Sequence, residues 1–156
     1  MVLAVGLLSF IKGAGSKLFE KKEVEAPVVE KEVLKASALL VHVHSLNISF
    51  KTLTVVAQNE KVTLKGEVDN QSDAEKIALA VGNLEGVSSV DNQIEVAVKE
   101  PESKYHTVVE GDWLFKIAKT YYNHATKFDV IFEANNPMLS DPDKIYSGQV
   151  LRIPNL

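Results

Sequence analysis

The spacing of apolar residues alternates between a helical and a strand period along the first two thirds of the chain, and this alternation restricts the fold more than any other feature. A three-to-four spacing predicts a helix from about Pro27 to His44. Strict alternation from Leu53 to Val68, interrupted by the polar residues Gln58 to Lys61, predicts a β-hairpin. The residues expected on the inner face of the helix are Val29, Val33, Ala36, Leu40 and Val43.

A second helix and a last strand follow the hairpin. Ser72 and Glu75 have the spacing of a capping box, so the helix should begin with these two side chains bonded to the backbone. The glycine-bearing segment Gly82 to Val87 ends the helix. The next apolar alternation predicts a strand from Val90 to Val98 with Val98 buried. The order helix, hairpin, helix, strand predicts a small α+β module with its helices on one sheet face.

A short charged segment, residues 99–103, contains a proline and indicates a linker. After it, the pattern predicts a strand at Tyr105 to Val109, two helices, and a closing strand within Ile145 to Ile153. Asp112 and Thr126 stand where helix N-caps are expected. The second module, residues 104–156, is therefore predicted to be a βααβ unit.

Several short motifs of the first module follow one another in a fixed order. They are Gly66-Glu67-Val68, Ala74-Glu75-Lys76-Ile77-Ala78 and Val87-Ser88-Ser89-Val90-Asp91-Asn92. In these motifs, and in its order of elements, the chain from residue 27 to residue 98 resembles a BON domain. The resemblance implies the same α+β fold.

The second module resembles a LysM domain from end to end. The motifs are Tyr105 to Val108, Glu110 to Leu114, Ile131 to Asn135, Ile145 to Gln149 and Val150 to Pro154. The resemblance implies a groove for peptidoglycan or another N-acetylglucosamine glycan. Trp113 stands where the family usually has threonine, and it either stacks on a sugar or fills the groove. The groove residues implied by the resemblance are Gly111, Asp112, Trp113, Ser147 and Gly148.

Composition and charge disfavour several classes of function. A formal net charge of -4 argues against binding to nucleic acid, because that binding depends on clustered Lys and Arg. The chain has no cysteine, nucleophile elbow or P-loop, so we expect no enzyme activity. His42 and His44 are two residues apart, so on a helix their side chains point away from each other. This spacing disfavours a metal site formed by the two histidines. His106 and His124 have no carboxylate partner close in the sequence.

The N-terminal part, residues 1–26, is predicted to form a short amphipathic helix followed by a charged segment. Leu7, Ile11, Ala14 and Leu18 recur at helical spacing. No basic region precedes the apolar residues, as a secretory signal would require, and the apolar stretch is shorter than the roughly 20 residues of a membrane span. These features predict a cytoplasmic protein without a transmembrane segment.

Two glycine-bearing segments, Phe10 to Ser16 and Val81 to Val87, can aim successive carbonyl oxygens at one point. A cage of carbonyls without a carboxylate suits K⁺, whereas Mg²⁺ demands small octahedral geometry. Ordinary helix capping by glycine is the alternative explanation of the same spacing.

The motifs Phe10 to Leu18, Ala80 to Leu84 and Ile131 to Leu139 extend the comparison over nearly the whole chain. In them the chain resembles the BON–LysM potassium-binding proteins of the bacterial cytoplasm. The resemblance implies a K⁺ sensor or buffer in which the ion orders the N-terminal helix and both modules. The alternative is an envelope adaptor that holds peptidoglycan through LysM. The main-chain carbonyls that the resemblance implies as K⁺ ligands are those of Ile11, Ala14, Ser16, Gly82, Leu84 and Val87.

Overall fold

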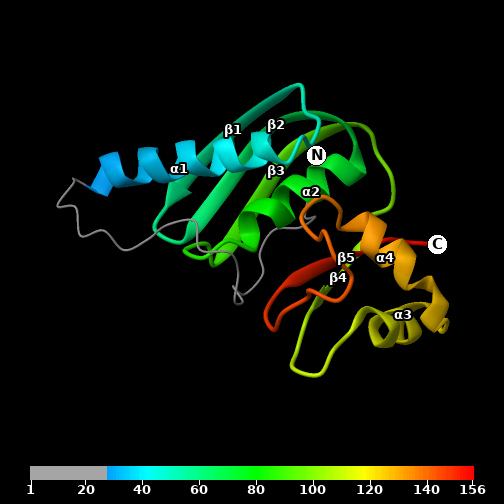
Figure 1. Ribbon diagram of the computed structural model, residues 1–156. Helices are drawn as coiled ribbons and strands as arrows, with labels where there is room; N and C mark the ends of the chain where they lie inside the picture. The colour runs from blue at the N-terminus through cyan, green and yellow to red at the C-terminus, as the bar shows by residue number, and fades with distance from the viewer. Residues whose placement is uncertain (1–27) are drawn as a thin grey trace.

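The computed structural model describes residues 28–156 (Figure 1). The predicted N-terminal helix, and with it Ile11, Ala14 and Ser16, lies outside the described residues. Helices and strands alternate as the sequence predicts, which confirms the α+β fold class. The elements of the first module are α1 (Val28–Ser45), β1 (Thr52–Gln58), β2 (Lys61–Asn70), α2 (Gln71–Gly82) and β3 (Ser89–Val98).

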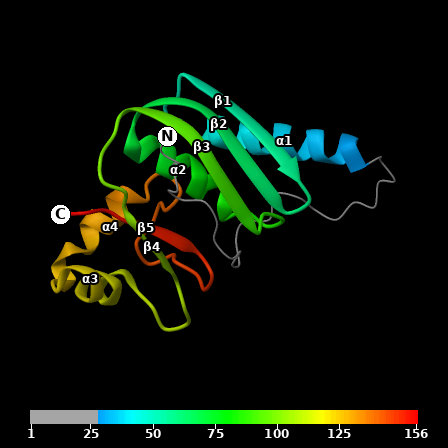
Figure 2. The same ribbon diagram turned by 180° about the vertical axis from the view of Figure 1, so that it is seen from behind.

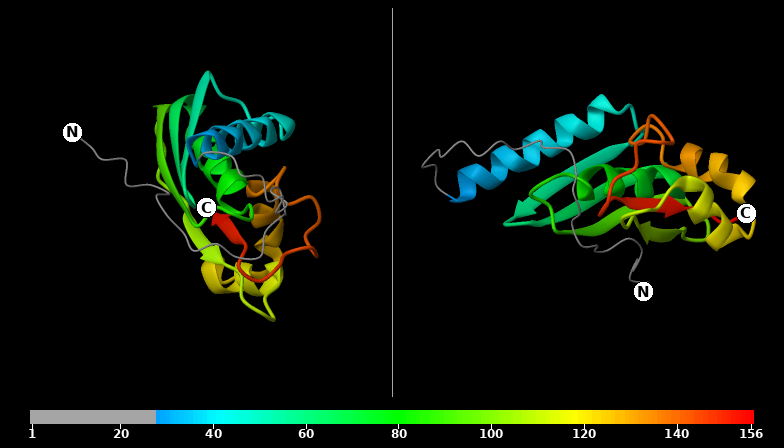
Figure 3. Two further views of the ribbon diagram at one scale, coloured as in Figure 1. Left: turned by 90° about the vertical axis from the view of Figure 1, so that its left-hand side faces the viewer. Right: turned by 60° about the horizontal axis from the view of Figure 1, so that its bottom comes forward.

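The first module is a three-stranded sheet with the order β1-β2-β3. β1 and β2 are antiparallel and form the predicted hairpin, whereas β2 and β3 are parallel and are connected through α2. Both helices lie on the same face of the sheet, as the edge-on view in Figure 3 shows. α1 contacts β1, and α2 contacts β2 and β3, so the core lies between the helices and this face.

The inner face of α1 differs from the predicted one. Val43 is completely buried, as predicted, but so is Leu39, which was not on the predicted face, and Val33 is 59% exposed. The prediction for Val33 was therefore wrong, because the contact with the sheet runs along a different stripe of the helix. Val98 was predicted to be buried, but it is 62% exposed and is the last residue of β3, so that prediction was also wrong.

Gly66 shows why the module needs glycine in the middle of a strand. Its φ angle is +149°, and a Cβ atom there would lie 2.1 Å from the carbonyl oxygen of Thr52 on β1. Only a residue without a side chain allows β1 to approach this closely. Two residues later, Val68 points into the core, which explains the spacing of the Gly66-Glu67-Val68 motif.

The second module has the predicted βααβ order, with an additional turn of 3-10 helix before the second helix. Neither predicted N-cap residue acts as a cap: the helices begin after Trp113 and Lys127, without a side-chain cap bond. Asp112 and Thr126 were therefore wrongly predicted as caps. The elements are β4 (Lys104–Thr107), α3 (Leu114–Tyr122), η1 (Ala125–Lys127), α4 (Phe128–Ala134) and β5 (Val150–Ile153).

The second module packs against the first through α2 and β5 (Figure 2). The side chain of Val150 on β5 is buried in the core of the first module, and Tyr105 and Met138 pack against that core. The two modules therefore share part of one hydrophobic core. Among residues 28–156, no helix is both long enough and apolar enough to cross a bilayer.

Candidate functional site

The last residue of α2 and the turn after it carry the described half of the predicted ion ligands, Gly82, Leu84 and Val87. All three residues are buried. The Asn83 N–H donates to the carbonyl of Leu79 at 3.0 Å, and the Leu84 N–H donates to that of Val81 at 3.2 Å. The Gly82 carbonyl accepts neither of these bonds, as expected near the end of a helix, where the last carbonyls lack intrahelical partners.

Gly86 lets the chain leave this turn and enter β3. Its φ angle is +92°, in the region that favours glycine. The Val87 N–H then donates to the Leu84 carbonyl at 3.3 Å, which closes the turn. The three predicted ligand residues therefore lie at the end of α2 and in the short turn that leads from it to β3.

A lysine side chain from α1 donates to a carbonyl of this turn. The ammonium group of Lys35 on α1 donates to the Gly86 carbonyl and, at 2.7 Å, to the carbonyl of Asn59 in the β1–β2 hairpin. The Asn59 N–H in turn donates to a Glu32 carboxylate oxygen at 2.6 Å. Lys35 thus joins α1 to the turn through Gly86, whose carbonyl is not among the predicted ion ligands.

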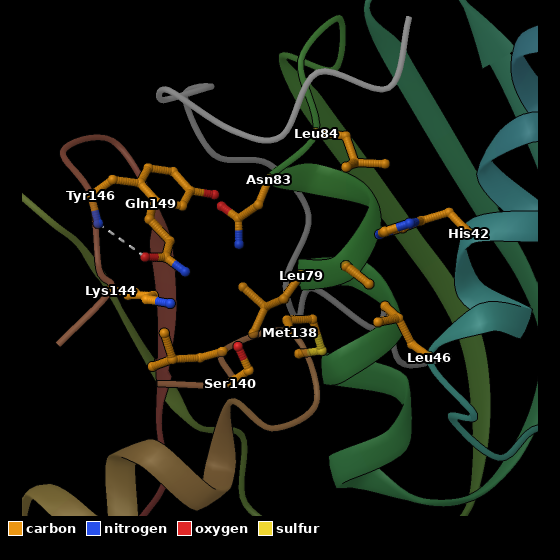
Figure 4. Close-up of a pocket in the computed structure, with 12 residues that line it drawn as sticks. His42, Leu46, Leu79, Asn83, Leu84, Met138, Ser140, Lys144, Tyr146 and Gln149 are labelled. Carbon is orange, nitrogen blue, oxygen red and sulfur yellow. Dashed lines mark hydrogen bonds between the residues drawn. The ribbon is translucent and has the colours of Figure 1, made fainter. Parts of the chain in front are cut away.

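Asn83 connects the same turn to the second module. Its side-chain amide donates to the Val150 carbonyl at 3.0 Å, and its amide oxygen accepts the Val150 N–H at 2.8 Å. Figure 4 shows Asn83 projecting from the end of α2 toward the second module. The turn is therefore bonded directly to β5.

Glu75 forms a second connection between the modules. Its carboxylate accepts hydrogen bonds from Tyr105 Oη at 2.8 Å, Arg152 Nε at 3.4 Å and the Ser103 N–H at 3.3 Å. Glu75 is 2% exposed and Arg152 8% exposed, so this ion pair is buried at the junction. Burial, and then the charge of Glu75, raise the pKa of Tyr105 far above its usual range.

The predicted capping box was wrong because Glu75 is used at this junction. The N-terminus of α2 is capped instead by Asn70, whose side-chain oxygen accepts the Asp73 N–H at 2.9 Å. Asparagine and serine are both common helix caps, so Asn70 can cap α2 in the role that was predicted for Ser72. Glu75 is consequently free to point toward Arg152.

A cavity of roughly 140 Å³ lies between the modules, beside Asn83 (Figure 4). Burial lowers the pKa of His42, which lines the cavity from α1. The cavity shows that the turn after α2 faces a junction of three parts of the chain: α1, α2 and the loop before β5. Its other lining residues are Leu46, Leu79, Ala80, Leu84, Met138, Leu139, Ser140, Lys144, Tyr146 and Gln149.

The predicted glycan-groove residues lie on two loops of the second module. The Gly148 N–H donates to the Val108 carbonyl at 2.7 Å, so the Ser147-Gly148 loop lies beside the end of β4. On the other loop, Gly111 has a φ angle of +85°, and Trp113 is 64% exposed. An exposed indole is open to a partner, and its role toward a sugar stays a prediction.

Asp112 is bonded within its own module. Its carboxylate lies 2.8 Å from His106 Nε2 and 3.4 Å from Lys116 Nζ, and it accepts the Val109 N–H at 3.1 Å. Burial acts to raise the pKa of Asp112, but the hydrogen bonds from His106, Val109 and Lys116 outweigh burial and lower it. His106 therefore has a carboxylate partner in space that the sequence did not indicate, and its other ring nitrogen contacts Tyr121 Oη at 3.1 Å.

Comparison with known proteins adds to this geometry. The family model for the BON domain matches residues 36–98, and that for the LysM domain matches residues 106–154. The potassium binding protein Kbp of Escherichia coli O6:H1 is 39% identical to this chain, over 96% of this chain and 99% of its own length. The chain belongs to the Kbp family.

A second relative is an uncharacterized protein of Deinococcus radiodurans. It is 33% identical over 113 residues, which are 65% of this chain and 44% of the relative. The turn from Gly82 to Val87 lies within the BON match, and Val150 lies within the LysM match. In this member of the Kbp family, the bond between Asn83 and Val150 therefore joins the two matched domains.

Proposed function

We propose that this protein binds K⁺ through main-chain carbonyls and acts as a K⁺ sensor or buffer in the cytoplasm. The observation that carries the proposal is the match to a potassium binding protein over nearly the whole length of both chains. The glycine-bearing segment at the end of α2 supports it, because the proposed ligand residues Gly82, Leu84 and Val87 are buried and lie within six positions of one another.

The proposed ligands are the carbonyls of Gly82, Leu84 and Val87 together with those of Ile11, Ala14 and Ser16. Carbonyl dipoles can replace the hydration shell of a large monovalent ion at low cost. A set of this kind does not supply the charge and tight octahedral geometry that Mg²⁺ prefers. Side-chain substitutions at these positions should matter little, because the ligand atoms belong to the main chain.

We further propose that the ion orders three parts of the chain: the N-terminal residues 1–26, the BON domain (27–98) and the LysM domain (104–156), with residues 99–103 as the linker. The protein then acts by binding and not by catalysis. The shared core at Val150 supports this view, because a change at the turn after α2 reaches LysM through a packed contact.

Peptidoglycan binding through the LysM domain is the less favoured function. The Asp112 side chain is held by His106, Val109 and Lys116, and Trp113 replaces the usual threonine of the groove. Any contact of this groove with a glycan would therefore rest mainly on the exposed indole and on main-chain groups.

Thermal unfolding in matched chloride salts tests the proposed function. We expect KCl and RbCl to raise the unfolding temperature of the full chain more than NaCl or choline chloride at equal ionic strength. A ligand that binds only the folded state stabilises it by roughly 2.7 kcal/mol at about 100 times its dissociation constant. Circular dichroism at increasing temperature measures the shift, and equal unfolding curves in all four salts would refute K⁺ binding.

A further inference from the structure

The outer edge of β5 is covered by asparagine side chains. β5 pairs with β4 on one side only, so main-chain groups on its other side need partners. Asn135, the residue directly after α4, bonds to both the N–H (2.8 Å) and the carbonyl (2.9 Å) of Arg152. Asn83 bonds in the same way to Val150, two residues earlier along the strand. Each amide takes the place of a neighbouring strand.

The two asparagines differ in origin. Asn135 belongs to the same domain as β5, whereas Asn83 comes from the BON domain, 67 positions earlier in the chain. Asn83 is also the residue between Gly82 and Leu84, two of the proposed K⁺ ligands. If β5 moves and the Asn83 side chain stays bonded to it, the main chain of Asn83 moves too. The carbonyls of the neighbouring residues Gly82 and Leu84 would then change position.

We propose that Asn83 is a positioning residue for the ion: its amide uses β5 to hold the Gly82 and Leu84 carbonyls in place. This inference rests on the proposed K⁺ site and adds the residue that couples that site to LysM. Because coupling between two binding events is reciprocal, K⁺ on the turn must also tighten the bond between Asn83 and Val150. The position of LysM then reports whether the ion is bound.

The Asn83→Ala substitution tests this role without straining the main chain. Asn83 has φ -82° and ψ -2°, which alanine adopts freely. We expect the K⁺ dissociation constant of the full chain, measured by calorimetric titration with KCl in choline chloride, to rise about tenfold, which corresponds to about 1.4 kcal/mol. Only the part of the two hydrogen-bond energies that differs between the ion-bound and the ion-free protein changes the dissociation constant, and two neutral hydrogen bonds are strong enough to allow a change of this size.

Asn70→Ala is the matched control. It removes an asparagine cap from the other end of the same helix, so it lowers helix stability but leaves the turn after α2 intact. We expect its K⁺ dissociation constant to stay within about twofold of that of the unsubstituted protein, a change worth less than the 1.4 kcal/mol of a tenfold shift. An equal loss in both variants would mean that general loosening, and not the Asn83 contact, weakens binding, and would overturn the proposal.

Hydrogen exchange in the unsubstituted protein gives an independent test, which holds even if the alanine variant fails to fold. The Val150 N–H donates to Asn83, whereas the Val108 N–H donates to Gln149 within LysM. K⁺ should slow exchange at Val150 more than at Val108. Equal changes at both amides, or an unchanged K⁺ affinity in folded Asn83→Ala, would overturn the role of Asn83. If the unsubstituted protein shows no K⁺ binding at all, the proposed function itself fails.

Discussion

Replacing Glu75 with alanine is expected to lower the free energy of unfolding by about 3 to 5 kcal/mol, because it leaves the buried guanidinium group of Arg152 without its carboxylate partner. The Tyr105 hydroxyl and the Ser103 N–H lose their acceptor in the same variant. Urea unfolding followed by circular dichroism measures the change. It should be accompanied by separation of the LysM domain from α2, because two of the lost bonds, those from Tyr105 and Arg152, connect Glu75 to that domain.

Glu133→Ala is the control for this prediction, because Glu133 also lies on a helix but its side chain is exposed. Its effect should stay within about 0.5 kcal/mol, as for most surface substitutions. The double variant Glu75→Leu with Arg152→Met should be more stable than Glu75→Ala, since it removes both charges together. A loss below about 1 kcal/mol for Glu75→Ala would contradict a buried, stabilising ion pair at the junction.

Gly66→Ala is expected to destabilise the BON domain by about 3 kcal/mol or more, since a strained φ angle alone costs of order 1–3 kcal/mol. The added Cβ would also overlap the Thr52 carbonyl oxygen at 2.1 Å, which forces β1 away from β2. The same urea unfolding measurement applies.

Gly111→Ala isolates the cost of the backbone angle, so the difference between the two variants gives the steric part. Gly111 also has a positive φ angle, +85°, but a Cβ there meets no atom within 4 Å. We expect it to cost only about 1 kcal/mol, the strain of the backbone angle alone. If both alanine variants lose the same stability, the close approach of β1 does not require glycine at position 66.

The sequence predicted those parts of the fold that depend on local patterns. The alternation from Leu53 to Val68 predicted the hairpin, and the helical spacing before it predicted the end of α1 to within one residue. Gly66 was recognised as part of a motif, and the structure shows why glycine is needed there: β1 passes too close for a side chain. Such features are predictable because hydrophobic period and backbone geometry act over a few residues.

The contacts between the domains could not be predicted in this way. Glu75 and Arg152 are 77 positions apart, and nothing in the sequence near Glu75 distinguishes a buried ion pair from a helix cap. Asn83 had the appearance of an ordinary residue at a helix end until its bonds to Val150 were known. A contact within LysM was missed as well. His106 and Asp112 are only six positions apart, but the sequence did not show that the turn between them brings the two side chains together.

The proposed ion site rests on local sequence patterns and, for one half, on the structure. Its described half, Gly82, Leu84 and Val87, was suggested by a glycine pattern and a family resemblance, and all three residues are buried at or just after the end of α2. The other half, Ile11, Ala14 and Ser16, lies outside the described residues. The assignment of all six carbonyls as ligands therefore stays a proposal that an experiment on the N-terminal residues can decide.

The most direct test of the K⁺ site is a calorimetric KCl titration of the full chain and of a variant that lacks residues 1–19. The full chain should bind K⁺ in preference to Na⁺, and Lys12→Ala should bind it equally well, because the Lys12 side chain is not a proposed ligand. The truncated variant should keep its native circular dichroism and lose K⁺ binding, since half the carbonyls are gone and no preorganised water replaces them. Unchanged K⁺ affinity in the folded, truncated protein would contradict the site proposed here.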